Sequence, residues 1–275
     1  MKNKNNLVEI EKALKNQKII AMLAPSFVTD FHYPSIISEL RALGFSKVVE
    51  LTFGAKMVNR EYHRMLSGSR NLLITSVCPG VVNAIRAKYP QYVKNLAKVD
   101  SPMIATAKIC KKVYGMKTCF ISPCHAKKIE VMGSEFVDYV IDYQQLHYLL
   151  HKNLVAPSNK KEHFDKFYND YTKIYPLSGA LSKTAHLRDV LKKKEEKIID
   201  GWSNVEKFLQ KPNKKIRFLD ITFCKGGCIG GPCTSKLSLR KKKKLLMRYL
   251  EHSKHEKIPR QKLGLVEKAK KIRFS

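Results

Sequence analysis

The sequence is poor in acidic residues. Its 275 residues include 53 lysines and arginines but 23 aspartates and glutamates, which gives a formal net charge of +30 at pH 7. A field of this size attracts polyanions and acidic proteins and speeds their encounter at low salt. Nucleic acid is one such partner, but no RNA-recognition signature and no zinc-finger spacing accompany the charge. A lysine-rich surface without a specific partner is an equally good interpretation.

The sequence also lacks long apolar runs. None approaches the ~20 residues that a membrane-spanning helix needs, and the polar segment from Met1 to Asn6 does not resemble a secretory signal. We therefore expect a cytoplasmic protein with no membrane contact. The apolar fraction of 44% allows a sizeable core, and the length suits one large domain or two lobes around a shared cleft.

The cysteines do not indicate a disulfide framework. They number seven, which is odd, and no export signal precedes them, so we expect reduced thiols that act as ligands or as core residues. Cys110 and Cys119 fall inside predicted elements and are expected in the core, because free cysteine is among the most buried residue types. Cys233 receives no role from the sequence.

Strand and helix patterns alternate along the chain, without an internal repeat or a linker rich in proline, glycine and serine. This order predicts α/β layers. Apolar segments predict strands at 18–23, 47–53, 72–78, 116–121 and 139–142, and another from residue 218. Helical patterns lie between them, including one over 179–195 and a final basic helix over 235–251.

Four cysteines lie at or just beyond the ends of predicted strands, namely Cys78, Cys124, Cys224 and Cys228. Ligands collect at the carboxyl ends of strands in open α/β sheets. The last two stand in a glycine-rich loop, and glycine lets a backbone approach a bulky inorganic group. Structural zinc usually takes closely paired cysteines within a short module, whereas an iron–sulfur cubane accepts wide spacing. The spacing alone leaves open both a cubane and a hairpin with buried cysteines.

Three segments resemble the signature motifs of the iron-only (FeFe) hydrogenases, in the same order. They are Thr-Ser-Val-Cys-Pro-Gly at 75–80, Ser-Pro-Cys-His-Ala-Lys-Lys-Ile-Glu at 122–130, and the cysteine-bearing loop at 218–231. Ala-Pro-Ser at 24–26, Phe-Gly-Ala at 53–55 and Ser101-Pro102 also match. The resemblance extends from about residue 18 to about residue 250.

The resemblance implies an α/β fold of two lobes, each a mainly parallel sheet flanked by helices, with a cofactor in the cleft between them. We expect an N-terminal helical extension over 1–17, a hydrogenase domain over 18–252 and a basic tail over 253–275. Lobe one is expected over 18–110 together with the C-terminal helix, and lobe two over 111–222. No ferredoxin-like cysteine run precedes residue 18, so a minimal, divergent member without accessory ferredoxin domains is expected.

The family's cofactor, the H-cluster, is a 4Fe-4S cubane joined through a cysteine sulfur to a two-iron unit with CO, cyanide and azadithiolate. By motif position the four cysteines named above would ligate the cubane, and Cys228 would be the bridging thiolate. Lys127 matches the lysine that holds a cyanide, which suits a buried ammonium. Three further matches follow from the resemblance. Ala24, Pro25 and Ser26 match the loop that packs on the dithiolate, and Ser101 and Glu130 match pocket residues that, with Lys127, are expected to be catalytic. Ser122 and Thr222 stand at the positions of two methionines that flank the cofactor. Taken singly, each of these residues would more often be structural.

The departures from the family concern proton transfer. Val77 stands where the family has a cysteine that donates a proton, and Tyr62 and Met65 stand where carboxylates continue the relay. General acid catalysis typically contributes ~10²–10⁴-fold in rate. We therefore expect a hydrogenase that catalyses 2H⁺ + 2e⁻ ⇌ H2 slowly.

The resemblance also implies partners, an acidic electron carrier such as ferredoxin and the hydrogenase maturation proteins. Two other functions stay open. One is an H2-sensing or iron–sulfur assembly protein on the same scaffold without significant turnover. The other is a basic nucleic-acid-binding protein with incidental cysteines, which the motif matches disfavour.

Overall fold

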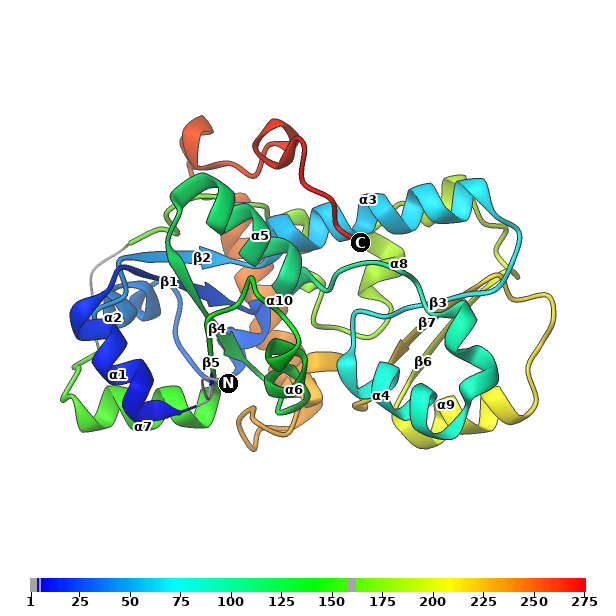
Figure 1. Cartoon of the computed structure of the whole chain (residues 1–275), viewed down its shortest axis with the longest axis horizontal. Coiled ribbons are helices and arrows are strands. Elements are labelled where there is room, and N and C mark those ends of the chain that lie inside the picture. The colour runs from blue at the N-terminus through cyan, green and yellow to red at the C-terminus, as the bar shows by residue number, and fades with distance from the viewer. Residues whose placement is uncertain (1–3, 5, 158–161) are drawn as a thin grey trace.

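The protein is an α/β molecule with two lobes, as the computed structural model in Figure 1 shows. The structure describes residue 4 and residues 6–157 and 162–275. Its strands are β1 (Ile19–Leu23), β2 (Lys47–Glu50), β3 (Leu73–Ile74), β4 (Lys117–Ser122), β5 (Tyr139–Asp142), β6 (Glu196–Asp200) and β7 (Phe218–Thr222). Its α-helices are α1 (Leu7–Asn16), α2 (Ser35–Ala42), α3 (Thr52–Gly68), α4 (Pro79–Lys88), α5 (Pro102–Tyr114), α6 (Ala126–Met132), α7 (Tyr143–Lys152), α8 (Ala180–Thr184), α9 (Trp202–Gln210) and α10 (Leu239–Lys254). Within the described residues, no helix combines the length and the apolar composition that a membrane crossing demands.

One lobe is built on a four-stranded parallel sheet in the order β2-β1-β4-β5. Every residue of β1 is buried, because both faces of the sheet are covered. Ile19 and Ala21 pack into a cluster with residues of α1, α2 and α7, whereas Ile20 and Met22 belong to a second cluster with residues of α3 and α5. Helices on both faces are the arrangement that buried parallel strands require.

The other lobe has a three-stranded parallel sheet in the order β3-β7-β6. Leu219 and Ile221 of β7 pack with apolar side chains of α4 and α9. Phe218 joins the core shared with the first lobe and meets the ring of Tyr62 on α3, with 5.9 Å between the ring centroids. Helix α3 runs along the top of Figure 1 from one lobe to the other. The two-lobed α/β fold expected from the sequence is therefore confirmed.

The division of the chain between the lobes differs from the prediction. The sequence predicts lobe one over 18–110 with the C-terminal helix and lobe two over 111–222, but β4 and β5 join the sheet of β1 and β2. Strand β3, predicted in lobe one, pairs with β7 instead. The reason is that parallel strands are joined by crossovers, so sheet membership follows long-range pairing rather than chain order.

Two predicted elements have other bounds. The strand expected over 47–53 ends at Glu50, and α3 begins at Thr52. The helix expected over 179–195 is only the five residues of α8, because His186 takes a left-handed conformation (φ 53°) that a helix cannot continue. Strand β6 is not predicted from the sequence, because its charged residues at 196–197 do not alternate with apolar ones as in a half-buried strand.

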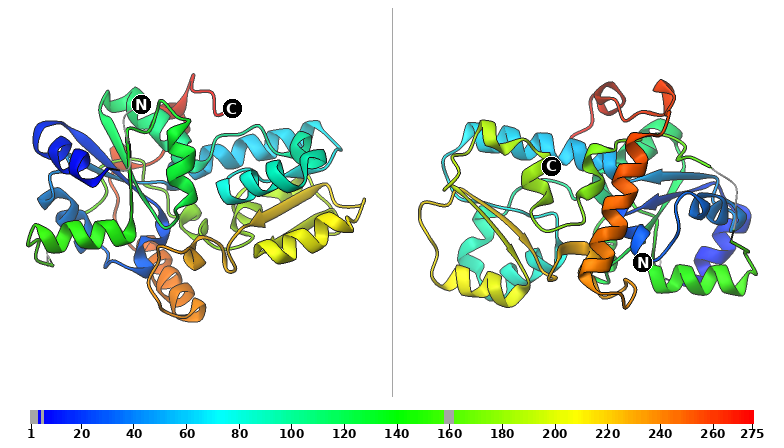
Figure 2. Two further views of the ribbon diagram at one scale, coloured as in Figure 1. Left: turned by 60° about the horizontal axis from the view of Figure 1, so that its bottom comes forward. Right: turned by 180° about the vertical axis from the view of Figure 1, so that it is seen from behind.

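The C-terminal segment over 253–275 is basic, as predicted, but it packs against the molecule. It lies over α3 and α5 (Figures 1 and 2). The Asp100 backbone N–H donates to the Phe274 carbonyl at 2.8 Å, and the side chains of Ala269 and Phe274 are buried in the core shared by the lobes. This segment therefore belongs to the folded domain.

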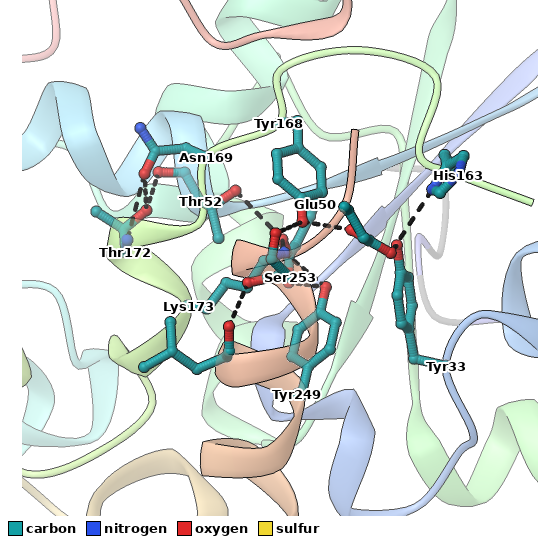
Figure 3. Close-up of polar contacts among 12 residues, drawn as sticks. Tyr33, Glu50, Thr52, His163, Tyr168, Asn169, Thr172, Lys173, Tyr249 and Ser253 are labelled. Carbon is teal, nitrogen blue, oxygen red and sulfur yellow. Dashed lines mark hydrogen bonds and ion pairs between the residues drawn. The ribbon is translucent and has the colours of Figure 1, made fainter. Parts of the chain in front are cut away.

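A buried ion pair fixes α10 to the first sheet. Lys173 and Glu50, both fully buried, lie 2.5 Å apart from Nζ to Oε2, and Tyr249 of α10 bonds to both (Figure 3). The ammonium also lies 4.4 Å from the ring centroid of Tyr168. Because isolated charges are costly to bury, each of these groups depends on its partners.

Candidate metal centre

The four cysteines singled out from the sequence meet between the lobes. Cys124 lies two residues beyond β4 and Cys224 two residues beyond β7, while Cys78 precedes α4 and Cys228 lies in the short 3-10 helix Gly227–Gly230. Cys78, Cys124 and Cys224 line a surface hollow of about 840 Å³. Cys78, Cys124 and Cys228 line an interior cavity of about 100 Å³. The thiols thus form the wall between the hollow and the cavity.

The loops that carry Cys124 and Cys224 are held in the same way. The Ser122 hydroxyl donates to the Cys124 carbonyl at 2.9 Å, and the Thr222 hydroxyl donates to the Cys224 carbonyl at 3.2 Å. Serine and threonine commonly stabilise tight turns through such local bonds. At the positions where the resemblance placed methionines, this chain therefore uses hydroxyls to shape the turns. Thr222 also lines the interior cavity, but Ser122 does not.

Two glycines allow the third motif to pack closely on the other loops. Gly227 has φ 77°, and a Cβ at this residue would lie 2.4 Å from the Pro176 carbonyl oxygen. A Cβ at Gly231 would lie 2.5 Å from the carbonyl oxygen of Pro123, the residue before Cys124. Any side chain would push these loops apart. The glycines therefore bring the cysteines of the two lobes together.

The surroundings of the thiols disfavour their ionisation in the absence of a cation. Burial and the neighbouring Cys124 and Cys78 raise the pKa of Cys224 to about 11. Burial raises the pKa of Cys124 as well, although the N–H groups of Ala126 and Lys127 partly oppose the rise. Cys228 is exposed and lines the cavity rather than the surface hollow; desolvation by the surrounding protein and the other three thiols raise its pKa far above the ordinary value. Metal binding overcomes such shifts, because ligation removes the protons.

The spacing of the thiols suits a cluster better than a single ion. Among the described residues, the one set of three ligand atoms that lie mutually within 4.8 Å is His125, Asp142 and Cys233. No three of the four cysteine sulfurs come so close. Four thiolates around one zinc ion at ≈ 2.3 Å would have to do so, whereas a polynuclear iron–sulfur cluster holds its thiolates farther apart.

Lys127 points toward the interior cavity, which it lines. Its ammonium donates to the Val77 carbonyl at 3.2 Å and to Glu130 Oε2 at 2.6 Å. An ammonium has three N–H donors, so one remains for an anionic group in the cavity. Glu130 does not line the cavity; it reaches the cavity only through Lys127.

Ala24, Pro25 and Ser26 also line the cavity, at the end of β1. The Ser26 hydroxyl lies 2.6 Å from the hydroxyl of Tyr143, so a second polar group supports it from behind. Ser101 lies at the N-cap position of α5 but makes no capping hydrogen bond, and its buried hydroxyl has no partner among the described residues. It does not line the cavity, although the next two residues do.

Val77 lines the cavity as an isopropyl group with no proton to donate. Behind it the Tyr62 hydroxyl accepts from the Ser76 N–H at 2.8 Å and lies 3.2 Å from the Ser76 hydroxyl. Met65 packs against the apolar core. These positions therefore offer one hydroxyl, that of Tyr62, and no carboxylate behind Val77.

Two polar residues of the cavity wall, Asp220 on β7 and Tyr175, are not among the site residues predicted from the sequence. Asp220 is a single acidic residue within an otherwise apolar strand segment, and this pattern could have indicated a functional role for it. Cys233, which had no predicted role, is buried with its sulfur 3.4 Å from both ring nitrogens of His125. Cys110 and Cys119 are fully buried core thiols, as expected.

The surface hollow has a basic rim. Lys225 and Lys236 are exposed and line it, and Lys242 of α10 contributes to its wall. The hollow is the open side of the cysteine wall, so a partner bound here would lie next to the metal centre.

Comparison with known proteins identifies the family of this chain. The family model described as "Iron only hydrogenase large subunit, C-terminal domain" matches residues 17–232. Iron hydrogenase 1 of Clostridium pasteurianum is 26% identical over 255 aligned positions, which cover 71% of this chain and 44% of the relative. The HndD subunit of the NADP-reducing hydrogenase of Solidesulfovibrio fructosivorans is 25% identical, over 70% of this chain and 44% of the relative. The chain spans less than half the length of these relatives.

Solved structures show the same fold. An [FeFe]-hydrogenase structure of HydA(ΔEFG) superposes with a TM-score of 0.71 at 14% identity and covers 95% of this chain and 94% of the other. A variant of HydA1 from Chlamydomonas reinhardtii gives a TM-score of 0.72 at 14% identity, covering 97% and 94%. The two-lobed arrangement thus persists although few residues are shared.

Proposed function

This chain belongs to the iron-only hydrogenase family, and from that premise we propose that it binds the H-cluster between its lobes and catalyses reversible H2 formation from protons and electrons. The observation that carries the proposal is the cysteine wall between the surface hollow and the interior cavity. Electrons can arrive from the side of the hollow, and protons can react on the side of the cavity.

The residues present fit the cofactor. Cys78, Cys124, Cys224 and Cys228 would hold the cubane, and Cys228, which lines the cavity, would bridge to the two-iron unit. The H-cluster, when bound, supplies redox-active iron at which protons and electrons are combined. Lys127 would orient it by donating its remaining N–H to a cyanide.

The other cavity residues shape and dry the site. Pro25 and Val77 exclude water from the cavity, and Ser26 presents a hydroxyl that Tyr143 supports. Ser101 and Glu130 act on the site only through neighbouring residues, because neither lines the cavity. Turnover is expected to be slow, since Val77 cannot donate the proton that the family's cysteine supplies.

We further propose that the electron donor is an acidic carrier of the ferredoxin type. The rim lysines Lys225 and Lys236 lie next to Cys224, and the net charge of +30 favours an acidic protein. Installation of the two-iron unit would require hydrogenase maturation proteins.

Infrared spectroscopy of protein matured with a synthetic two-iron unit tests the proposal. We expect CO and cyanide bands in the wild type. Lys127→Met should lose most of these bands and keep its cubane, because it removes the ammonium and leaves the thiols. Lys128→Met is the matched control, because Lys128 pairs with Asp142 outside the cavity. A wild type without CO and cyanide bands would refute the proposal.

The alternative is an H2-sensing or iron–sulfur assembly protein, which the missing relay favours. The two functions differ in turnover. A protein that shows CO and cyanide bands but evolves no H2 with a saturating reductant would be a sensor, and one that takes up a cubane alone would fit assembly.

A further inference from the structure

The interior cavity has one carboxyl group in its wall. Among the described residues that line it, Asp220 is the only acid and Lys127 the only cation. Asp220 lies in the central strand β7 of the second sheet and has 3% of its surface exposed. A carboxyl group at such a position is costly to bury in its charged form, so its presence calls for an explanation.

The hydrogen bonds of Asp220 do not neutralise it. Its Oδ2 accepts from the Ser182 N–H at 3.2 Å, the Ser182 side chain also favours the charged form, and among the described residues no lysine, arginine or histidine forms an ion pair with it. The titratable groups that face it are Tyr62 of α3, Tyr175 before α8 and Glu196 of β6. Burial, reinforced by Glu196, raises the pKa of Asp220 to about 6. The group can therefore hold or release a proton near neutral pH.

Helix α8 separates this carboxyl group from the surface. Leu181 lines the interior cavity, Ser182 contacts Asp220, and Thr184 lines a surface groove of about 870 Å³ between α3 and residues 169–189. Asn59 of α3 lines the same groove and donates to the Thr184 hydroxyl at 2.8 Å. The groove and the cavity are thus separated by a single turn of helix.

Buried polar groups lie on both sides of this turn. Among the described residues, the Asn59 Oδ1 on the groove side and the Tyr175 hydroxyl at the cavity have no hydrogen-bond partner, and the Ser182 side chain lies close enough to Asp220 to favour its charged form. Buried polar groups are nearly always hydrogen-bonded, if not to protein then to ordered water. The groove and the cavity thus each hold a polar group that ordered water would satisfy, and Ser182 lies in the short helix between them.

We propose that Asp220 is the proton donor and acceptor of the interior cavity, replacing the thiol that Val77 lacks, and that it exchanges protons with the groove beside α3 through Ser182. In the direction of H2 formation the carboxyl O–H bond breaks and its proton passes to the acceptor in the cavity. The carboxylate then takes a proton from water on the Ser182 side. Two such transfers, with two electrons from the reduced carrier, supply one H2. This inference rests on the proposed function.

The test compares Asp220→Asn with the wild type at equal two-iron occupancy and saturating reductant. We expect H2 evolution to fall at least ~10²-fold, the lower range for a lost general acid. Val77→Cys in the Asp220→Asn background should recover part of the rate, because it introduces an independent donor. Glu206→Gln is the control. It alters a carboxyl group of the second lobe that pairs with Lys88 and does not line the cavity, so its rate should stay within about twofold of the wild type.

A second readout does not depend on turnover. In protein that carries only the cubane, the infrared carbonyl band of one protonated carboxyl group should disappear as the pH rises through about 6, and Asp220→Asn should lack this band. An unchanged rate of H2 evolution in Asp220→Asn, or a carbonyl band that does not titrate near this pH, would overturn this inference but not the proposed function. A protein that takes up no two-iron unit would overturn both the inference and the proposed function.

Discussion

At the scale of single residues, the candidate metal centre contains groups whose charged form is disfavoured by burial. Burial raises the pKa of Cys124, Cys224, Cys228 and Asp220. The thiols and Lys127 line the walls where an anionic, metal-containing group would lie. Substitution of a ligand should therefore remove the cluster, whereas substitution of a thiol that is not a ligand should leave the cluster content unchanged.

The cysteine assignment predicts a clear division between ligands and core thiols. Cys124→Ser and Cys224→Ser should each bind little of the cubane, because serine replaces a thiolate ligand. Cys110→Ser and Cys119→Ser should keep their iron and sulfide per folded molecule, since both thiols lie in the apolar core. The measurement is iron and sulfide content after anaerobic reconstitution. A full cluster in Cys124→Ser would contradict the assignment.

Val77→Cys should accelerate H2 evolution. The new thiol would stand in the cavity wall next to Cys78 and supply a proton donor of similar size. The gain should be partial, because Tyr62 and Met65 still interrupt the path behind it. The rates are compared with a saturating chemical reductant at equal cofactor occupancy, and Val77→Ala serves as the control for altered packing. A gain in Val77→Ala equal to that in Val77→Cys would show that proton donation is not the cause.

The raised pKa of Asp220 also predicts how stability depends on pH. Its folded value of about 6 exceeds its ordinary value of 3.8. Between these values the native state binds more protons than the unfolded state, so its stability falls as the pH rises. The loss approaches about 3 kcal/mol, at 1.36 kcal/mol per pKa unit. Asp220→Asn should lack this loss, so its urea midpoint should exceed that of the wild type at pH 8 by more than at pH 5. If the urea midpoints of Asp220→Asn and the wild type differed by the same amount at pH 5 and pH 8, Asp220 would not be an unpaired buried carboxyl group.

At the scale of elements, short loops hold the centre while longer elements connect the lobes. The turns after β4 and β7 are stabilised by Ser122 and Thr222, and the close approaches at Gly227 and Gly231 join them. Helix α10 is tied to β2 through the Glu50–Lys173 pair and Tyr249. Because β2 ends beside Leu51, which lines the cavity, this tie also supports the cavity wall.

Breaking the buried pair should destabilise the whole domain. Lys173→Met leaves the Glu50 carboxylate buried without its cation, and the loss of one partner of such a pair typically costs ~3–5 kcal/mol. The double variant Glu50→Gln/Lys173→Met should recover part of the loss, because no uncompensated charge remains. Denaturant unfolding of the three proteins measures this. A single variant as stable as the wild type would show that the pair contributes little.

At the scale of the whole molecule, the charge of +30 and the basic rim predict electrostatic docking of an acidic carrier. The apparent affinity for ferredoxin should weaken steeply with added salt, because exposed charges are screened beyond ~8 Å at physiological ionic strength. Lys225→Gln/Lys236→Gln should weaken docking and reduce its dependence on salt. Lys193→Gln/Lys194→Gln, in a surface turn of the second lobe outside the hollow, is the matched control. Rates that do not change with salt would exclude this mode of docking.

The sequence by itself determined what is local or carried by short motifs. Apolar patterns and glycine-rich turns predicted most strands and helices, and three cysteine motifs identified the family that the match over residues 17–232 then showed. The motifs also predicted which loops carry the candidate ligands. Such features depend on neighbouring residues, so they can be recognised before the chain is folded.

Only the tertiary structure decided which distant segments meet. Strand β3 pairs with β7 rather than with the sheet nearer in the chain, and β6 forms because β7 offers it a partner. Lys173 pairs with Glu50, which lies 123 residues away in the chain. Asp220 lines the cavity, whereas Ser101 and Glu130 do not. These outcomes depend on long-range packing and on the burial it imposes, which set both the distances between groups and the free energy of their charges.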